Sequence, residues 1–389
     1  MKNIISKKVK DMAPSGIRVF FDLVLGMDDV ISLGVGEPDF VTPWKIRESA
    51  IYSIEQGYTS YTSNKGLNKL RQYIARHLKQ RFGLEYDPDD EILITVGVSE
   101  GLDLAARAII NPGDEVIIPQ PSYVSYGPVV HLAGGKPVFI DTKNSGFKLR
   151  PRDLAKQCNK KTKAILINYP SNPTGVSYTK GELRELSKVI LKHNLLVLCD
   201  EVYDELTYDY KHTPLATLSN KLRDRVIYFN GFSKAFAMTG WRVGYVCGNK
   251  DIIAAMTKIH QYTMLCAPIT SQMAACEALH SGKSSLEEMK KEYHRRRDFV
   301  LERLEEIGLD CVKPQGAFYV FPSVKKTGLS CLDFANKLLK EKKVAVVPGT
   351  AFGDNYQDHI RMSYASSLDH LKEAFQRIES FLRLHSPKK

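Results

Sequence analysis

From about Glu91 onward, the chain alternates short apolar runs with segments that have the periodicity of amphipathic helices. Six runs have the length and composition of strands: EILITVG, EVIIPQPSY, KPVFID, KAILINYP, LLVLCDEVY and RVIYFNGFS. Helices are expected from Ser99, around Tyr126 and from Thr179. Because parallel strands need a crossover segment between them, this alternation predicts a mostly parallel, doubly wound α/β sheet.

The pattern changes after the long helical segment SSLEEMKKEYHRRRDFVLERLEEIG. Strands are expected over Val312–Phe321, in VAVVPG and in IRMSYA, with a final helix from Leu368, which is an α+β arrangement. The first forty residues have too little apolar sequence to form a domain and are expected to pack on this later part. We therefore expect a large domain over 40–290 and a small domain made of 1–39 and 291–389.

Length and composition exclude several classes of protein. With 389 residues, 43% of them hydrophobic, the chain can bury a large core. No apolar run approaches the roughly 20 residues of a membrane span, and the start, MKNIISKKVKDMAPSG, lacks the apolar core of a signal peptide. A cytoplasmic protein with no membrane partner is expected. The seven cysteines include no CxxC pair and the ten histidines show no metal-ligand spacing, so reduced core thiols and no metal are expected.

The formal net charge of +11 raises the question of a nucleic-acid partner. Basic residues are mostly interleaved with acidic ones, as in KKEYHRRRDFVLERLEE, and this pattern favours solvated helix faces over a nucleic-acid surface. We expect no nucleic-acid partner. A positive potential would equally suit small anionic substrates.

A lysine follows the last of the apolar runs. The run RVIYFN stops at Gly231, so Lys234 lies where open α/β sheets bind ligands. An ammonium group at the end of a core strand must be solvated, paired or neutralised. Two roles fit: a cation for an acidic ligand, or an amine whose lowered pKa makes it a nucleophile toward a carbonyl.

Two other strands are expected to deliver polar residues to the same edge. One ends in NYPSNPTG, which carries Asn172, and the other ends in LLVLCDEVY, which carries Asp200 and Tyr203. Asp200 follows five apolar residues, so its carboxylate needs a cationic partner to stay ionised, and a protonated pyridine nitrogen is one. Tyr203 could donate to a phenolic oxygen on that ring, and a lysine could form an imine with the ring's aldehyde.

Further residues suit an anionic group and a flat ring. ITVGVSEGLD ends a strand in a glycine-containing turn that opens a helix, so its backbone N–H groups and Ser99 can face an anion. Arg242 supplies a permanently charged fork and Ser233 a hydroxyl, both close in sequence to Lys234. Tyr123, in PQPSYVSY, is placed to cover a flat ring by stacking.

Five motifs carry a family resemblance: GVGEPDF, SNPTG, DEVYDEL, GFSKAFAMTGWRVG and IRMSYA. They resemble the motifs of class I pyridoxal-phosphate aminotransferases of fold type I and occur in that family's order. The match runs from about Gly16 to beyond Arg361. It implies a mostly parallel seven-stranded sheet in the large domain, pyridoxal 5'-phosphate as cofactor, and an aminotransferase similar to the aspartate and aromatic enzymes of the prokaryotic subgroup.

The resemblance also implies roles for single residues. Lys234 would hold the cofactor as an internal aldimine and then carry the proton between the substrate α-carbon and the cofactor. Asp200 would keep the pyridine nitrogen protonated, Tyr203 and Asn172 would bond the phenolic oxygen, and Tyr123 would stack on the ring. The phosphate would be bound by Val98, Ser99, Ser233 and Arg242.

For the substrate, Arg361 matches the arginine that binds the α-carboxylate as a bidentate pair, assisted by Asn172 and the backbone of Gly36. Ile17 and Val35 could line the same pocket or belong to the core. Because Arg361 lies in the expected small domain, substrate binding could close that domain over the cofactor.

Tyr61, in YTSYTSNKG, resembles the tyrosine that reaches the phosphate from the neighbouring subunit. The resemblance therefore implies a homodimer with shared active sites.

Each of these residues also has a structural interpretation when it is taken alone. Asp200 could cap a helix, and Asn172 could form the turn in SNPTG. Tyr203 and Tyr123 could be core aromatics. Arg242 could pair with a nearby acid, and Arg361 could be a surface residue at a strand end. The conjunction of these residue types at strand ends favours the functional interpretation.

Substrate and reaction type leave alternatives open. Some aspartate-directed members of the subgroup carry a lysine at the position of Ser99, so a broad or aromatic specificity with 2-oxoglutarate as acceptor comes first and aspartate second. An acyl diaminopimelate, such as the N-acetyl compound, or a methionine-salvage oxo acid is also possible. The same scaffold hosts carbon-sulfur β-lyases and cyclopropane-forming synthases. It also serves as the effector module of transcription regulators, but residues 1–30 are too short for the DNA-binding domain expected there.

Overall fold

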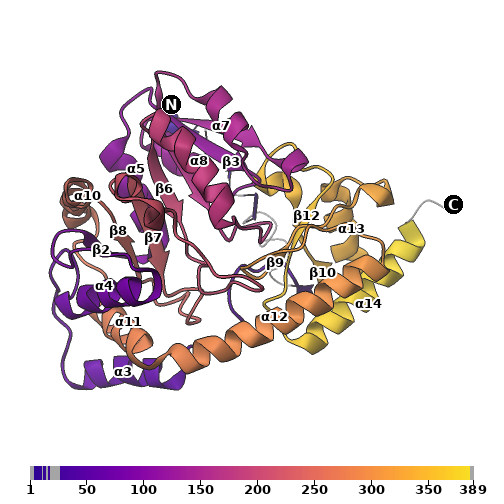
Figure 1. The fold of residues 1–389 in the computed structure, drawn as a ribbon. Coiled ribbons are helices and arrows are strands. Elements are labelled where there is room, and N and C mark those ends of the chain that lie inside the picture. The colour runs from indigo at the N-terminus through magenta and orange to yellow at the C-terminus, as the bar shows by residue number, and fades with distance from the viewer. Residues whose placement is uncertain (1–3, 11, 15, 18–26, 386–389) are drawn as a thin grey trace.

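The computed structural model describes residues 4–10, 12–14, 16–17 and 27–385. In Figure 1 a large sheet with its helices lies on one side of the molecule, and a smaller group of strands with α13 and α14 lies on the other. The helices of the first half are α1 (Lys7–Lys10), α3 (Trp44–Glu55), α4 (Asn68–Phe82), α5 (Gly97–Ile109), α6 (Tyr126–Leu132), α7 (Pro151–Gln157) and α8 (Lys180–Lys192). Those of the second half are α9 (Asn220–Arg223), α10 (Lys250–Thr263), α11 (Ile269–Ser281), α12 (Lys283–Glu306), α13 (Cys331–Lys342) and α14 (Leu368–His385).

The large sheet has seven strands in the order β2-β8-β7-β6-β5-β3-β4. Their bounds are β2 (Ile92–Thr95), β3 (Glu115–Gln120), β4 (Lys136–Asp141), β5 (Thr162–Asn168), β6 (Leu196–Asp200), β7 (Val226–Gly231) and β8 (Gly244–Cys247). Strands β3 to β7 pair in parallel, while β8 pairs antiparallel with both β7 and β2. Strands β2, β3, β4, β5, β6 and β7 therefore all end at one edge, which confirms the predicted mostly parallel sheet.

Helices cover both faces of this sheet. Successive side chains of a strand point to opposite faces, so neighbouring residues pack against different helices. In β6, Val197 and Cys199 pack in the cluster that includes α4 and α8, while Leu198 packs in the cluster that includes α5 and α10. Both faces are thus buried under helices, which explains why the strands have continuous apolar sequences instead of alternating ones.

Helix ends follow local sequence signals where these are present. Thr179 and Glu182 form a reciprocal capping box at the start of α8, which satisfies backbone N–H groups that have no partner inside the helix. Helix α5 begins at Gly97, two residues before the expected start at Ser99. The earlier start places Ser99 inside the first turn of α5.

The C-terminal part contains a three-stranded antiparallel sheet in the order β11-β12-β9. Its strands are β9 (Tyr319–Val320), β11 (Val347–Pro348) and β12 (Ile360–Ser363). A separate parallel pair joins β1 (Ile31–Ser32) to β10 (Val344–Ala345), so this part of the N-terminal segment packs as expected. Helix α1 instead contacts α6 of the large part, where Lys8 Nζ donates to the Leu132 carbonyl at 3.2 Å. The expected strand VAVVPG is split, because β10 pairs with β1 whereas β11 pairs with β12.

The strand expected over Val312–Phe321 is shorter in the structure. Its pairing with β12 begins only at Tyr319. The backbone N–H groups of Gln315 and Gly316 donate instead to the carbonyl of Gly175, and Ala317 has a φ of 58°, which interrupts an extended strand. These bonds tie the C-terminal sheet to the loop that follows β5.

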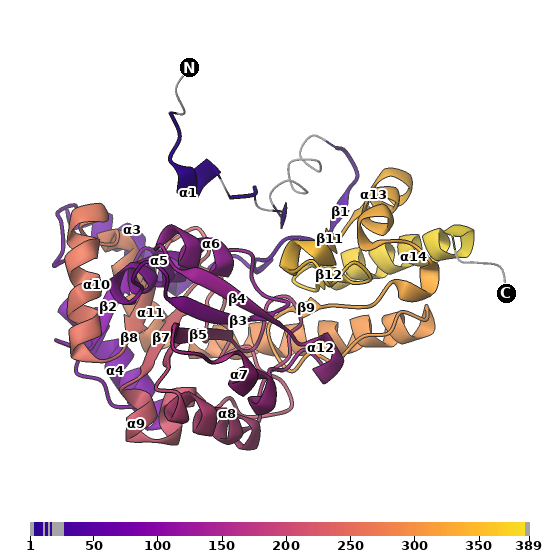
Figure 2. The ribbon, with the colours of Figure 1, turned by 90° about the horizontal axis from the view of Figure 1, so that it is seen from above.

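Helix α12 connects the two parts of the fold. In Figures 1 and 2 it runs from the neighbourhood of α11 below the large sheet to a position beside α14. The helix therefore extends through the boundary at residue 290 that the sequence suggested.

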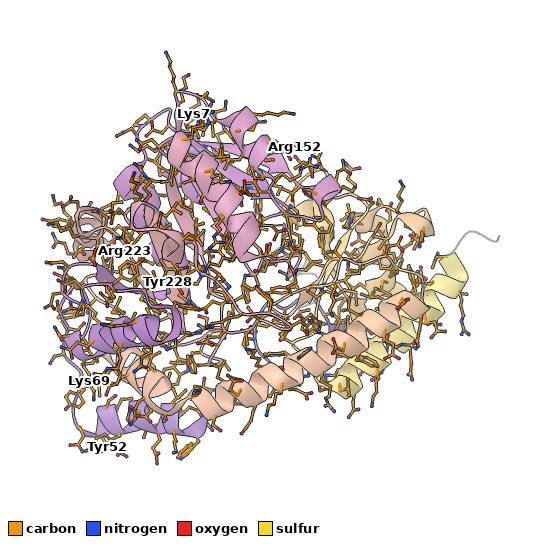
Figure 3. All side chains as sticks on the ribbon, in the orientation of Figure 1. Lys7, Tyr52, Lys69, Arg152, Arg223 and Tyr228 are labelled. Carbon is orange, nitrogen blue, oxygen red and sulfur yellow. The ribbon has the colours of Figure 1, made fainter. Side chains whose placement is uncertain are left out.

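The basic residues are spread over the surface of the molecule. Lys7 on α1, Lys69 on α4 and Arg152 on α7 are exposed and lie at separate edges in Figure 3. In the described ranges, no helix has both the length and the apolar character needed to cross a membrane.

Candidate active site

A cavity of about 780 Å³ opens at the edge where the parallel strands end. Eleven residues singled out in the sequence line it: Gly36, Val98, Ser99, Tyr123, Asn172, Asp200, Tyr203, Ser233, Lys234, Arg242 and Arg361. Ile17 and Val35 line it too. Tyr61 does not line this cavity, and its side chain is 83% exposed. The structure therefore brings the predicted strand-end residues together in one cavity. Tyr61 was expected to act in the neighbouring subunit's site, which a single chain does not test.

Asp200, the last residue of β6, lies buried in the cavity wall with two hydrogen-bond donors. Its Oδ2 accepts from the Tyr126 hydroxyl at 2.7 Å, and its Oδ1 accepts from the Val202 backbone N–H at 3.2 Å. Burial raises the pKa of Asp200 to about 6, although both hydrogen bonds act in the opposite direction. A buried carboxylate with a raised pKa is stabilised by a cation, so the site favours a positively charged group beside Asp200.

Lys234 lies three residues beyond the end of β7 and is partly buried. Its Nζ donates to the Gly36 carbonyl at 2.7 Å. The pKa of Lys234 is lowered to about 8, chiefly by burial and also by the positive charges of Arg361 and Arg242, against the attraction of Glu37. The lowered pKa gives a larger neutral fraction near pH 8, which is the form that attacks a carbonyl carbon.

The N-terminus of α5 faces Arg242 at one end of the cavity. Gly97 has a φ of 74°, and a Cβ there would lie 2.7 Å from a terminal nitrogen of Arg242, so glycine lets the guanidinium approach the helix start. Ser99 lies in the first turn of α5, and Ser233 lines the same cavity. Helix N–H groups, two hydroxyls and an arginine form a set of donors suited to a phosphate.

Arg361, on β12, is a buried cation in the lining of the same cavity. It donates to Asn172 Oδ1 at 3.0 Å and to the Gly34 carbonyl, while its Nε has no partner among the described residues. Its guanidinium carbon lies 4.6 Å from the ring centre of Tyr319 and 5.0 Å from that of Phe352. In the part of the chain that the structure describes, no carboxylate pairs with Arg361, so this buried charge is available to an anionic ligand.

The sequence assigned no role to several residues of this site. Tyr126 bonds Asp200, Asn168 donates to the Asp200 carbonyl at 2.8 Å, and the Thr239 hydroxyl donates to Glu37 at 3.1 Å. Tyr319 lies between Tyr203 and Arg361. Asn168 follows from its place at the end of β5, but Tyr126 and Tyr319 lie in stretches where other aromatic residues are equally plausible.

The donor set fits pyridoxal phosphate. An amine with a lowered pKa, a buried carboxylate suited to a cation, and an anion site at a helix N-terminus line one cavity. Among the described residues, no group of three or more His, Cys, Asp or Glu side chains forms a metal site.

Comparisons with known proteins agree with this geometry. The family model described as "Aminotransferase class I and II" matches residues 28–378. The chain is 53% identical to YugH of Bacillus subtilis, over 98% of this chain and 99% of the relative, and 46% identical to an aspartate aminotransferase of Pyrococcus abyssi, over 97% and 98%.

Solved structures give the same result. An aromatic aminotransferase from Pyrococcus horikoshii OT3 aligns with a TM-score of 0.89 and 44% identity, covering 95% of this chain and 99% of that one. An aspartate aminotransferase from Thermus thermophilus with maleate aligns with a TM-score of 0.93 and 35% identity, covering 98% and 100%. The chain therefore belongs to the class I and II aminotransferases, which are transaminases of fold type I that depend on pyridoxal phosphate.

Proposed function

We propose that this enzyme transfers the amino group of an L-amino acid to 2-oxoglutarate by a ping-pong reaction, with a broad preference for aromatic donors or aspartate. The observation that carries the proposal is the buried Arg361, which faces the same cavity as Lys234 and has no carboxylate partner in the described residues. An α-carboxylate supplies the missing charge and accepts two parallel hydrogen bonds from the guanidinium. An amino acid held there presents its amino group and α-carbon to Lys234.

The residues of the cavity divide the chemistry between them. Pyridoxal phosphate supplies the electron sink when it is bound. Lys234 holds the cofactor covalently and carries the proton at the substrate α-carbon, and Asp200 keeps the ring nitrogen protonated. Tyr203 and Asn172 bond the phenolic oxygen, and Tyr123 covers the ring. The phosphate is bound by Val98, Ser99, Ser233 and Arg242.

The substrate is positioned by Arg361 together with Asn172, whose amide oxygen already accepts from the guanidinium at 3.0 Å. The backbone of Gly36 assists, with Ile17 and Val35 along the same wall. We further propose that residues 40–290 form a large domain, and that a small domain of 1–39 and 291–389 closes over the substrate and excludes water.

The choice of donor rests on the relatives and on Ser99. Relatives at 46% and 42% identity are named as an aspartate aminotransferase and an aromatic-amino-acid aminotransferase, and one at 43% as a "Probable N-acetyl-LL-diaminopimelate aminotransferase". A serine at position 99 offers a hydroxyl but no positive charge to a side-chain carboxylate, so the first turn of α5 does not favour acidic donors over aromatic ones.

Single-turnover spectroscopy tests this proposal. The purified protein, loaded with pyridoxal phosphate, is mixed separately with glutamate, aspartate, phenylalanine, tyrosine, alanine, methionine, cysteine and N-acetyl-LL-diaminopimelate. We expect aromatic donors and aspartate to bleach the visible band of the lysine-bound cofactor, and 2-oxoglutarate to restore it. Bleaching by the diaminopimelate alone would reject the proposed specificity, and pyruvate release from cysteine alone would reject transamination in favour of a β-lyase.

We also propose a homodimer in which Tyr61 reaches the phosphate of the partner's site. This placement is supported by the 83% exposure of Tyr61, since a tyrosine that serves only its own chain is usually more buried. Trp44 and Tyr52 on α3, each 56% exposed, are further apolar surface that a subunit contact could cover.

Tyr61→Phe tests the shared site. Loss of one hydrogen bond to a charged phosphate should weaken pyridoxal-phosphate binding about 10- to 100-fold. The cofactor dissociation constant is measured by fluorescence or equilibrium dialysis, with Tyr262→Phe as the matched control at another tyrosine, which is 84% exposed. Unchanged cofactor affinity in Tyr61→Phe, or a monomer in sedimentation, would contradict the shared site.

A further inference from the structure

Tyr319, on β9, lies between the two halves of the cavity. Its side chain is fully buried, and its hydroxyl oxygen is 2.9 Å from the hydroxyl oxygen of Tyr203. The face of its ring lies under the guanidinium of Arg361, with 4.6 Å from the guanidinium carbon to the ring centre. One side chain thus contacts both the tyrosine assigned to the cofactor and the arginine assigned to the substrate.

The backbone holds this tyrosine in place from two sides. Tyr319 pairs with Ser363 in the antiparallel register of β9 and β12, two residues from Arg361 on the same strand. On the other side, a Cβ added to Gly36 would lie 2.7 Å from the Tyr319 hydroxyl, so the hydroxyl packs directly against that glycine. The Gly36 carbonyl is also the acceptor of Lys234.

Only one direction of the hydrogen bond between the two hydroxyls leaves the Tyr203 proton free for the cofactor. When Tyr203 donates to a phenolic oxygen of the cofactor, its own oxygen can still accept a hydrogen bond. Tyr319 is the donor in reach, at 2.9 Å, and a hydroxyl that accepts a bond becomes a stronger donor itself. The ring of Tyr319 contributes separately. The guanidinium of Arg361 is attracted to the face of this ring, and the contact fixes the plane of the guanidinium.

We propose that Tyr319 is a positioning residue that couples the cofactor-facing and substrate-facing parts of the site: its hydroxyl orients Tyr203 toward the cofactor's phenolic oxygen, and its ring supports Arg361 for the substrate carboxylate. This inference rests on the function proposed above. It also explains why a small-domain strand contributes a buried tyrosine to a cofactor site formed mostly by the large sheet.

Two substitutions separate the hydroxyl from the ring. Tyr319→Phe removes only the hydroxyl, and we expect the pH midpoint of the visible absorption of the lysine-bound cofactor to rise by about half to one pH unit, because the ionised phenolic oxygen loses support from Tyr203. Tyr319→Leu also removes the ring, and we expect the KM for the amino donor to rise about 3- to 30-fold in addition.

The controls keep the effect assignable to Tyr319. Tyr364→Phe removes a buried hydroxyl that donates to the Ala317 carbonyl at 3.1 Å, outside the cavity, and should leave the midpoint unchanged. The charged groups that face the tyrosine pair, Arg361, Asp200 and Glu37, are kept in every variant.

The decisive experiment is the spectral titration of wild-type, Tyr319→Phe, Tyr319→Leu and Tyr364→Phe holoenzymes, followed by steady-state KM and kcat with one donor. A midpoint in Tyr319→Phe equal to that of wild type would overturn the hydroxyl role, and an unchanged KM in Tyr319→Leu would overturn the ring role. If wild type itself shows no visible band, the proposed function fails. This outcome is distinct from a normal band whose pH midpoint does not change when Tyr319 is replaced.

Discussion

Lys234→Ala should bind pyridoxal phosphate without a covalent bond and lose transamination by at least about four orders of magnitude. The expected loss is large because one side chain has two tasks. It exchanges the covalent attachment with the substrate amine, and it moves a proton at the α-carbon, a step that alone contributes roughly 10²- to 10⁴-fold. Turnover is measured with a donor and 2-oxoglutarate at saturating cofactor.

Lys234→Arg is the matched variant that separates nucleophile from cation. Arginine keeps the positive charge near Asp200 and Gly36 but remains protonated, so it cannot attack a carbonyl. If Lys234 acted only as a cation for an acidic ligand, the arginine variant would retain most of the activity. Substantial turnover in either variant is incompatible with the role assigned to Lys234.

Asp200→Asn should lower transamination by two to four orders of magnitude and weaken cofactor binding in parallel. The neutral amide keeps the shape of the side chain but no longer stabilises a protonated ring nitrogen beside it, and removing one partner of a buried charge pair costs about 3–5 kcal/mol. Activity and cofactor affinity are measured on the same preparation. A rate equal to that of wild type would rule out the electron-sink argument.

The same substitution should have the opposite effect on cofactor-free protein. The pKa of Asp200 is raised from 3.8 to about 6, so the native state binds more protons than the unfolded state between these values, and its stability falls as the pH rises through that window. At pH 8, Asp200→Asn removes this penalty and should raise the free energy of unfolding by up to about 3 kcal/mol. A destabilised cofactor-free variant, measured by urea unfolding, would show that burial of Asp200 is not costly.

How far the sequence predicts the site depends on the position of each residue in the fold. Asp200, Asn172 and Lys234 were predictable because each lies at or just beyond the end of a buried parallel strand, and all such strands end at one edge. Arg361 was predictable only through the family motif IRMSYA, since no pattern of spacing places a strand of the C-terminal sheet beside the edge of the large sheet.

Tyr126 and Tyr319 mark what the sequence did not predict. Tyr126 follows Tyr123 by three residues, and only the turn that starts α6 decides which of the two points at Asp200. Tyr319 belongs to a segment expected to be a continuous strand, yet the positive φ of Ala317 and the bonds to Gly175 delay the strand until Tyr319 itself. Both outcomes depend on tertiary contacts, which local propensity does not encode.

The direction of strand β8 is another feature that the sequence did not predict. Its sequence, GYVC, begins at the last glycine of the motif that contains Arg242, and it is too short for periodicity to assign a direction. The structure pairs Gly231 of β7 with Gly244 of β8, antiparallel, and a Cβ on Gly244 would lie 2.9 Å from the backbone nitrogen of Val98. The turn between β7 and β8 is thus what brings Ser233, Lys234 and Arg242 to the start of α5.

The most direct test of the central claim is to reduce the loaded enzyme with borohydride and map the modified peptide by mass spectrometry. Reduction makes an imine bond permanent, so the residue that carries the cofactor retains the added mass of the cofactor. The account predicts a single modified peptide containing Lys234, and no label after prior addition of an amino donor that converts the cofactor. Label on a different lysine, or no stable label in an enzyme that still transaminates, would contradict it.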